Sequence, residues 1–196
     1  MTTQALPRRR TNQLSDRTEE VAQFVREQIS AGLSEAGAIE VSVVALSAKS
    51  PVVHALRTAY NNDMSHSVRL RLILATMPEN DPVQEMADLA PIEVRWAANP
   101  RFLDAHEQLV IGESASWTGD CMRRDPEKRD AYQSFNSNCL EATGWARISF
   151  ERLWGSAEPL AVVDASEFAT SDRDLPQALP ITYTPAEWSQ RDRDSQ

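Results

Sequence analysis

The feature that most constrains the fold of this 196-residue chain is a series of three apolar, β-branched segments separated by helix-length intervals. Ser50-Pro51 and Asp81-Pro82 lie between the segments and indicate helix starts, because proline is favoured in the first turn of a helix. Strands separated by such helices form parallel βαβ units with right-handed crossovers. We therefore predict an α/β fold with a mixed, mainly parallel sheet flanked by helices. The predicted strands are residues 39–46, 68–76 and 92–98.

Two longer helices are expected around this series of strands. Apolar residues at helical spacing predict an N-terminal helix that begins near Ser15 or Asp16 and stops at Gly37. Residues 140–155 predict a closing helix with apolar side chains along one side. We assign its aromatic residues to the core, because aromatic side chains at helical spacing are usually buried. These residues are Trp145, Phe150 and Trp154.

Between the third strand and the closing helix, the sequence indicates antiparallel structure. Residues 108–112 and 114–117 are typical of a hairpin that turns at Gly112-Glu113. Residues 123–130 are strongly charged and are expected to form a loop. Residues 131–137 are compatible with one further strand.

Composition divides the chain into three segments. Residues 1–14 are polar and are predicted to be flexible, and residues 15–171 form one α/β domain. Residues 172–196 are predicted to be an extended or disordered tail, because prolines interrupt any helix there. Trp188 lies in this tail, where an isolated tryptophan could anchor a protein partner.

Charge and hydropathy limit the partners and the compartment. The net charge is −9 and the isoelectric point is about 4.9, which disfavours general attraction to phosphate backbones, so nucleic acid is an unlikely partner. No apolar run approaches the ~20 residues of a membrane span. Because no apolar segment follows the N-terminal arginines, we expect a cytoplasmic protein without a signal peptide.

The two cysteines, Cys121 and Cys139, do not define a disulfide framework in a chain of this length. They could pair, but reduced thiols are the expectation for a cytoplasmic protein. The sequence has no CxxC pattern and no Cys/His cluster with zinc-ligand spacing. We therefore expect no metal and no cofactor.

His106 is the leading candidate for chemistry. It precedes an apolar strand, and a histidine can act as a nucleophile or as a general acid or base because its pKa lies near neutrality. The alternative is a strand-end histidine that hydrogen-bonds a backbone carbonyl. His54 and His66 provide no metal-ligand spacing with it.

The segment Trp117-Thr118-Gly119-Asp120 is a second candidate. Gly119 permits close backbone approach, and the carboxylate of Asp120 could orient an imidazole. Arg123 and Arg124 follow and could bind an anionic group. The alternative is a turn followed by a solvated charged loop, because the acidic residues of 125–130 would neutralise much of the positive field.

Taken together, residues 39–155 resemble one half of a phospholipase D-type protein. That family carries a His-x-Lys-x4-Asp strand, a Gly-Ser-x-Asn segment and a helix that closes on phenylalanine and tryptophan. In this chain His106 matches the histidine, Gln108 stands at the lysine and Glu113 stands at the aspartate. Residues 119–122 stand near the Gly-Ser-x-Asn segment, one residue early, and residues 149–154 match the closing helix.

The departures from this pattern determine the expected function. In the family, histidines attack and protonate a phosphodiester while lysines bind the phosphoryl oxygens. Gln108 supplies a hydrogen bond without the charge, so stabilisation of the transition state falls. The serine and asparagine are also missing, whereas glutamate can replace aspartate. The resemblance thus implies a decayed or repurposed site.

Three functions follow from these observations. The preferred one is a non-catalytic binding or regulatory module, homodimeric because the chain supplies one half, with an interface at His106 and residues 117–124. The alternative is a single-half phosphodiesterase or nuclease that joins His106 from two subunits, with Arg123 and Arg124 replacing the lysine. A third is an ordinary doubly wound domain whose ligand lies at the carboxyl ends of its strands.

Overall fold

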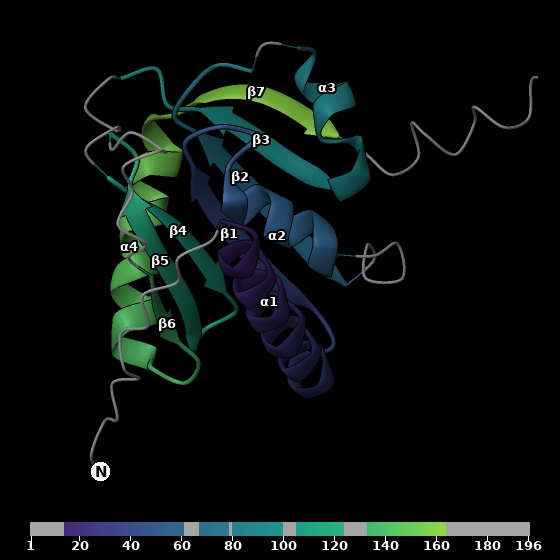
Figure 1. The fold of residues 1–196 in the computed structure, drawn as a ribbon, viewed down its shortest axis with the longest axis vertical. Helices are drawn as coiled ribbons and strands as arrows, with labels where there is room; N and C mark the ends of the chain where they lie inside the picture. The colour runs from purple at the N-terminus through teal and green to yellow at the C-terminus, as the bar shows by residue number, and fades with distance from the viewer. Residues whose placement is uncertain (1–13, 61–66, 79, 100–104, 124–132, 164–196) are drawn as a thin grey trace, which may run out of the picture.

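The computed structural model describes residues 14–60, 67–78, 80–99, 105–123 and 133–163. These residues form one seven-stranded mixed sheet flanked by helices, so the predicted α/β class is confirmed (Figure 1). The elements in chain order are α1 (Leu14–Ala36), β1 (Ile39–Ala45), α2 (Pro51–Ala59), β2 (Val68–Leu74), α3 (Pro82–Glu85), the 3-10 turn η2 (Ala87–Leu89), β3 (Ile92–Trp96), β4 (His106–Ile111), β5 (Ala115–Cys121), β6 (Ser134–Asn136), α4 (Leu140–Ser156) and β7 (Glu158–Val163).

The sheet has the strand order β6-β5-β4-β1-β2-β3-β7. Parallel pairing is confined to β1–β2 and β2–β3, the βαβ units that the sequence predicts. Four further pairings, β1–β4, β3–β7, β4–β5 and β5–β6, are antiparallel. Antiparallel pairs therefore outnumber parallel ones in the described sheet, and the expectation of a mainly parallel sheet holds only for its centre.

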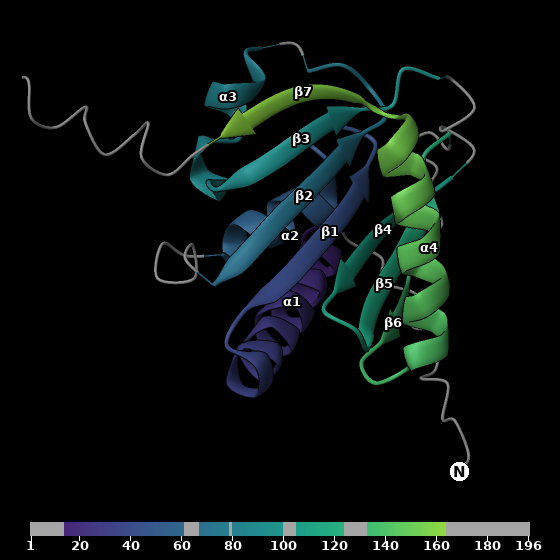
Figure 2. The ribbon, with the colours of Figure 1, turned by 180° about the vertical axis from the view of Figure 1, so that it is seen from behind.

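The two faces of the sheet carry different cores. Helices α1 and α2 cover one face, and α4 crosses the other (Figures 1 and 2). Along β2, Leu70 and Leu72 are buried in the large core with α1 and α2, because alternate residues of a strand point to the same face. Ile73 joins Phe150 and Trp154 of α4 in a smaller core. Arg71, which also faces α4, is the buried charged residue of this strand.

The predicted turns lie where the sequence indicates them. Gly37 follows α1 with φ 73°, and Gly112 turns the β4–β5 hairpin with φ 56°. Both values lie in the left-handed region that glycine adopts at no steric cost. Asp81 caps α3 by accepting a hydrogen bond from the backbone N–H of Val83. The side chains of Ser15 and Asp16 lie outside the described residues.

The C-terminal part of the domain differs from the sequence analysis in two ways. Residues 158–163, to which the sequence analysis assigned no element, form β7, which pairs with β3, and Val163 is completely buried. Trp145 was expected in the core, yet its side chain is 65% exposed. Trp145 and Phe150 are five residues apart, which places them about 140° apart around a helix of 3.6 residues per turn.

Three predicted features cannot be compared with this structure. Residues 1–13 and 164–196, including Trp188, lie outside the described residues, as does Arg124. Within the described part of the chain, no helix is long and apolar enough to cross a membrane.

Candidate functional site

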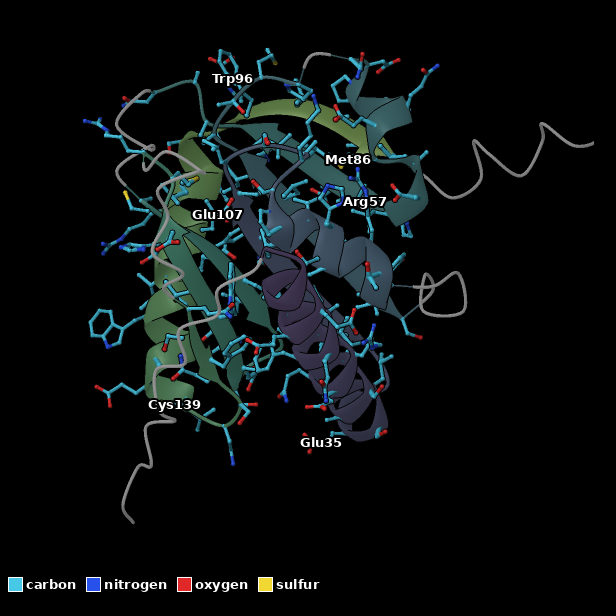
Figure 3. The ribbon with its side chains drawn as sticks, viewed as in Figure 1. Glu35, Arg57, Met86, Trp96, Glu107 and Cys139 are labelled. Atoms are coloured by element: carbon cyan, nitrogen blue, oxygen red, sulfur yellow. The ribbon has the colours of Figure 1, made fainter. Side chains whose placement is uncertain are left out.

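The candidate site lies where β4 begins beside the carboxyl end of β1. The buried carboxylate of Glu107 accepts a hydrogen bond from the backbone N–H of Leu46, the residue that follows β1, at 3.2 Å. Arg57 of α2 donates to the carbonyl of Ala48 at 3.2 Å and so holds the same loop from the other side. Figure 3 shows Glu107 and Arg57 on either side of this loop. The start of β4 is therefore fixed against the β1–α2 connection.

His106 is the first residue of β4, and its side chain is exposed. Its Nδ1 lies 2.8 Å from the carbonyl oxygen of Gly119 on β5. Because a carbonyl only accepts hydrogen bonds, Nδ1 carries the proton in the neutral ring and Nε2 is the acceptor. This contact is the alternative that the sequence left open for His106, and it fixes the tautomer that presents a basic Nε2.

The Gln108 amide is directed toward α4. Its Nε2 donates to the carbonyl of Ala146, in the middle of that helix, at 2.6 Å. This carbonyl also belongs to the hydrogen-bond ladder of α4, and the side chain of Gln108 is half-buried against the helix. The position that would hold a lysine in the phospholipase D pattern thus makes a structural contact between β4 and α4.

Glu113 lies at the opposite end of the hairpin from His106. It is exposed in the turn after Gly112, and one of its carboxylate oxygens is 3.9 Å from Nη1 of Arg147. Seven residues of extended chain correspond to about 23 Å at 3.3 Å per residue. The structure therefore does not bring Glu113 to the candidate site, although its spacing matches the pattern.

Trp117 and Gly119 lie on the face of β5 that packs in the large core. The ring of Trp117 is 2% exposed, and its Nε1 donates to Oε1 of Gln133 at 3.3 Å. A Cβ placed on Gly119 would lie 2.4 Å from Cη2 of Trp117. Gly119 thus makes room for the indole, and Trp117 offers no surface to a ligand beside His106.

The remaining candidates lie at the end of β5. Cys121 is the register partner of His106, with an irregularity between His106 and Gln108. Asp120 is buried at 2% exposure, and Arg123 is exposed. Met122 is buried against Phe150 and Trp154. In the alignment with the phospholipase D pattern, Met122 stands near the position of the asparagine. The structure therefore gathers His106, Cys121 and Arg123 at one end of the sheet.

Sequence reasoning missed Glu107 as a residue of this site. A glutamate at an inward-facing strand position, between two polar residues, is the signal that could have indicated it, because a buried carboxylate needs hydrogen-bond donors. Its partner, Leu46, is 61 residues away in the chain. The loop after β1 shows no motif that announces this donor.

Within the described residues, the cysteines and acidic side chains provide no metal centre. Neither Cys121 nor Cys139 forms a disulfide in the described structure. Cys139 follows β6, and its backbone N–H donates to Ser114 at the hairpin turn, the end of β5 remote from Cys121. Figure 3 shows Cys139 and Glu107 far apart along this part of the sheet. Among the described residues, no group of histidine, cysteine and acidic side chains could hold a metal ion.

Comparison with known proteins shows distant structural likenesses only. No protein-family model matches the chain, and no curated protein matches it. One similar solved structure is TrmBL2, described as an archaeal chromatin protein with a novel mode of DNA binding, at 12% identity and a TM-score of 0.44, covering 80% of this chain and 55% of that one. Another is NucT from Helicobacter pylori, at 12% identity and a TM-score of 0.47, covering 74% and 93%. The chain thus spans about half the length of TrmBL2, and neither likeness assigns an activity to it.

Proposed function

We propose that this chain is a non-catalytic phospholipase D-like domain that acts as a binding or regulatory module and assembles as a homodimer. The contact between the Gln108 amide and the Ala146 carbonyl supports this proposal most directly. A neutral amide therefore stands at the position where the family has a phosphate-binding lysine. This amide is directed into the β4–α4 interface.

Phosphodiester cleavage needs positive charge where the phosphoryl oxygens develop negative charge. Gln108 cannot supply that charge, and burial of Met122 places an apolar side chain near the position of the missing asparagine. Two buried carboxylates, Glu107 and Asp120, flank the strand end that carries His106. These groups do not form the surroundings of an anionic transition state.

Binding of a ligand, unlike catalysis, does not require groups that stabilise a transition state. His106 and Arg123 are both exposed at this end of the sheet, where they carry an imidazole ring and a planar guanidinium. A polar ligand that both donates and accepts hydrogen bonds would fit this end of the sheet. The alternative, a phosphodiesterase or nuclease, is favoured by the same exposed Arg123, which could replace the lysine.

The test is hydrolysis of bis(p-nitrophenyl) phosphate and of single- and double-stranded DNA by the full chain. We expect no turnover above that of the buffer in any of the three assays. Turnover that is lost in His106→Ala and kept in His54→Ala would overturn the non-catalytic proposal, because His54 is exposed on α2. If Gln108→Lys alone gains activity, the missing cation is the cause of inactivity in the native chain.

A further inference from the structure

Helix α4 presents an unusual outward surface. Trp145 is 65% exposed and Ile148 is 45% exposed, although the opposite side of the same helix is buried in the small core. Glu141 and Arg152 are also exposed, one turn before Trp145 and one turn after Ile148. We call these four residues the α4 stripe. Their spacing of four, three and four residues places them within about 60° of arc on a helix of 3.6 residues per turn.

The order of residues in the α4 stripe is self-complementary. When two copies of a helix pair in opposite directions, a residue of one copy lies opposite a residue of the other wherever their two residue numbers add up to one fixed value. Glu141 with Arg152 and Trp145 with Ile148 satisfy this condition about one common centre, between Ala146 and Arg147. A single two-fold axis would therefore place each glutamate beside the partner's arginine and each tryptophan beside the partner's isoleucine.

The charged ends of the α4 stripe are available for such pairing. Among the described residues, neither the carboxylate of Glu141 nor the guanidinium of Arg152 takes part in an ion pair. The neighbouring acid, Glu151, is instead engaged by Arg71 on the inner side of α4. Spacing of four and three residues is also the pattern of helix pairs that pack at about 20°.

Gly144 and Gly155 border the α4 stripe on the side of Ile148. A Cβ at either position would meet nothing within 4 Å, so the subunit itself does not require glycine there. Glycine is unfavourable inside a helix relative to alanine. These positions leave room for the backbone of a second helix to approach closely, as small residues do where helices cross.

We propose that two copies of this chain associate through the α4 stripe, with their α4 helices antiparallel. The proposal rests on the homodimer of the proposed function, but it replaces the interface expected at the His106 end of the sheet. In this arrangement the interface is formed by the side of α4 that faces away from the small core.

Charge reversal tests this arrangement. Glu141→Arg and Arg152→Glu should each weaken self-association about tenfold, because each creates two like-charge pairs in the dimer. Mixed in equal amounts, the two variants should associate with the wild-type affinity, since the heterodimer pairs arginine with glutamate at both ends. The measurement is sedimentation velocity of the full chain over a range of concentrations. Glu35→Arg, the same change of charge on the end of α1 (Figure 3), is the matched control and should leave association unchanged.

The outcomes separate this proposal from the proposed function. If wild type is a dimer and both reversals leave its affinity unchanged, the α4 stripe is not the interface while the homodimer stands. If wild type is monomeric at every concentration, both the homodimer and this interface are wrong, and the hydrolysis assays still decide the non-catalytic assignment. Trp145→Ser should weaken the dimer more than about a hundredfold, since a central tryptophan is lost on both sides, and Val162→Ser, at an exposed apolar position on β7, should not.

Discussion

The guanidinium of Arg71, on β2, donates to the carboxylate of Glu151, on α4, at 2.5 Å. The same guanidinium reaches Glu40 of β1 at 2.5 Å and lies 4.8 Å from the ring centroid of Phe150. Burial lowers the pKa of Arg71, but the hydrogen bond that Arg71 donates to Glu151 and the charges of both carboxylates outweigh it, so the pKa is raised and the side chain stays charged. Arg71 therefore fastens α4 to the centre of the sheet.

Replacement of Arg71 by methionine should destabilise the domain by about 2 kcal/mol, because it removes charge-assisted hydrogen bonds and a cation–π contact and leaves two carboxylates close together. Glu151→Gln should cost less than about 1 kcal/mol, since the Glu151 side chain is 48% exposed and Glu40 still pairs with the arginine. Urea unfolding measures both values. If Arg71→Met is as stable as Glu151→Gln, Arg71 does not fasten α4 to the sheet.

Gly119→Ala should destabilise the domain by about 1–3 kcal/mol, because its Cβ would overlap the buried Trp117 ring and force the core to shift. Gly144→Ala is the matched control on α4. It meets no atom within 4 Å and should stabilise the monomer by about 0.5–1 kcal/mol. Thermal unfolding at a concentration below that of dimer formation reports both effects. If the two variants change the unfolding temperature equally, contact with Trp117 is not the reason for glycine at position 119.

The centre of the fold could be predicted because its signals are local. Strands β1, β2 and β3 are rich in apolar residues, and Pro51 and Pro82 mark the helix starts between them. Strand β7 could not be predicted in this way. Its first residues are Glu158 and Pro159, and its position depends on the open edge of β3, more than 60 residues earlier.

The candidate site was predictable only in part. His106 begins β4 and Arg123 follows β5, and the pairing of these two strands is the part that the sequence indicated as a hairpin. The contacts that decide their chemistry are not local. The amide of Gln108 finds its acceptor 38 residues away on α4, and the partner of Glu107 is on a different strand connection. Spacing in the sequence contains no information on either contact.

Tyr60 links stability to alkaline pH. Its hydroxyl donates to the carbonyl of Ala90 at 3.2 Å, and burial raises the pKa of Tyr60 to about 12. Because the folded pKa is raised, the neutral hydroxyl contributes stability that is complete below the unfolded pKa of 10.0 and is lost as the pH rises through about 12. Tyr60→Phe should cost about 1 kcal/mol at neutral pH, through loss of this hydrogen bond.

The difference between wild type and Tyr60→Phe should therefore shrink as the pH rises from 10 to 12. Urea midpoints of both proteins across this interval measure it. If the urea midpoints of the two proteins fall equally as the pH rises, groups other than Tyr60 cause the alkaline loss of stability.

Truncation separates the C-terminal tail from the domain. We expect a chain that ends at Ser171 to unfold cooperatively with only a small loss of stability, because it keeps all of β7. A chain that ends at Ala157 lacks β7, uncovers the edge of β3 and removes Val163, which is completely buried in the large core. Loss of one such side chain alone costs about 1.5–3 kcal/mol of burial. We therefore expect the shorter chain to lose its cooperative thermal transition, while collapse of the chain that ends at Ser171 would place part of residues 172–196 in the core.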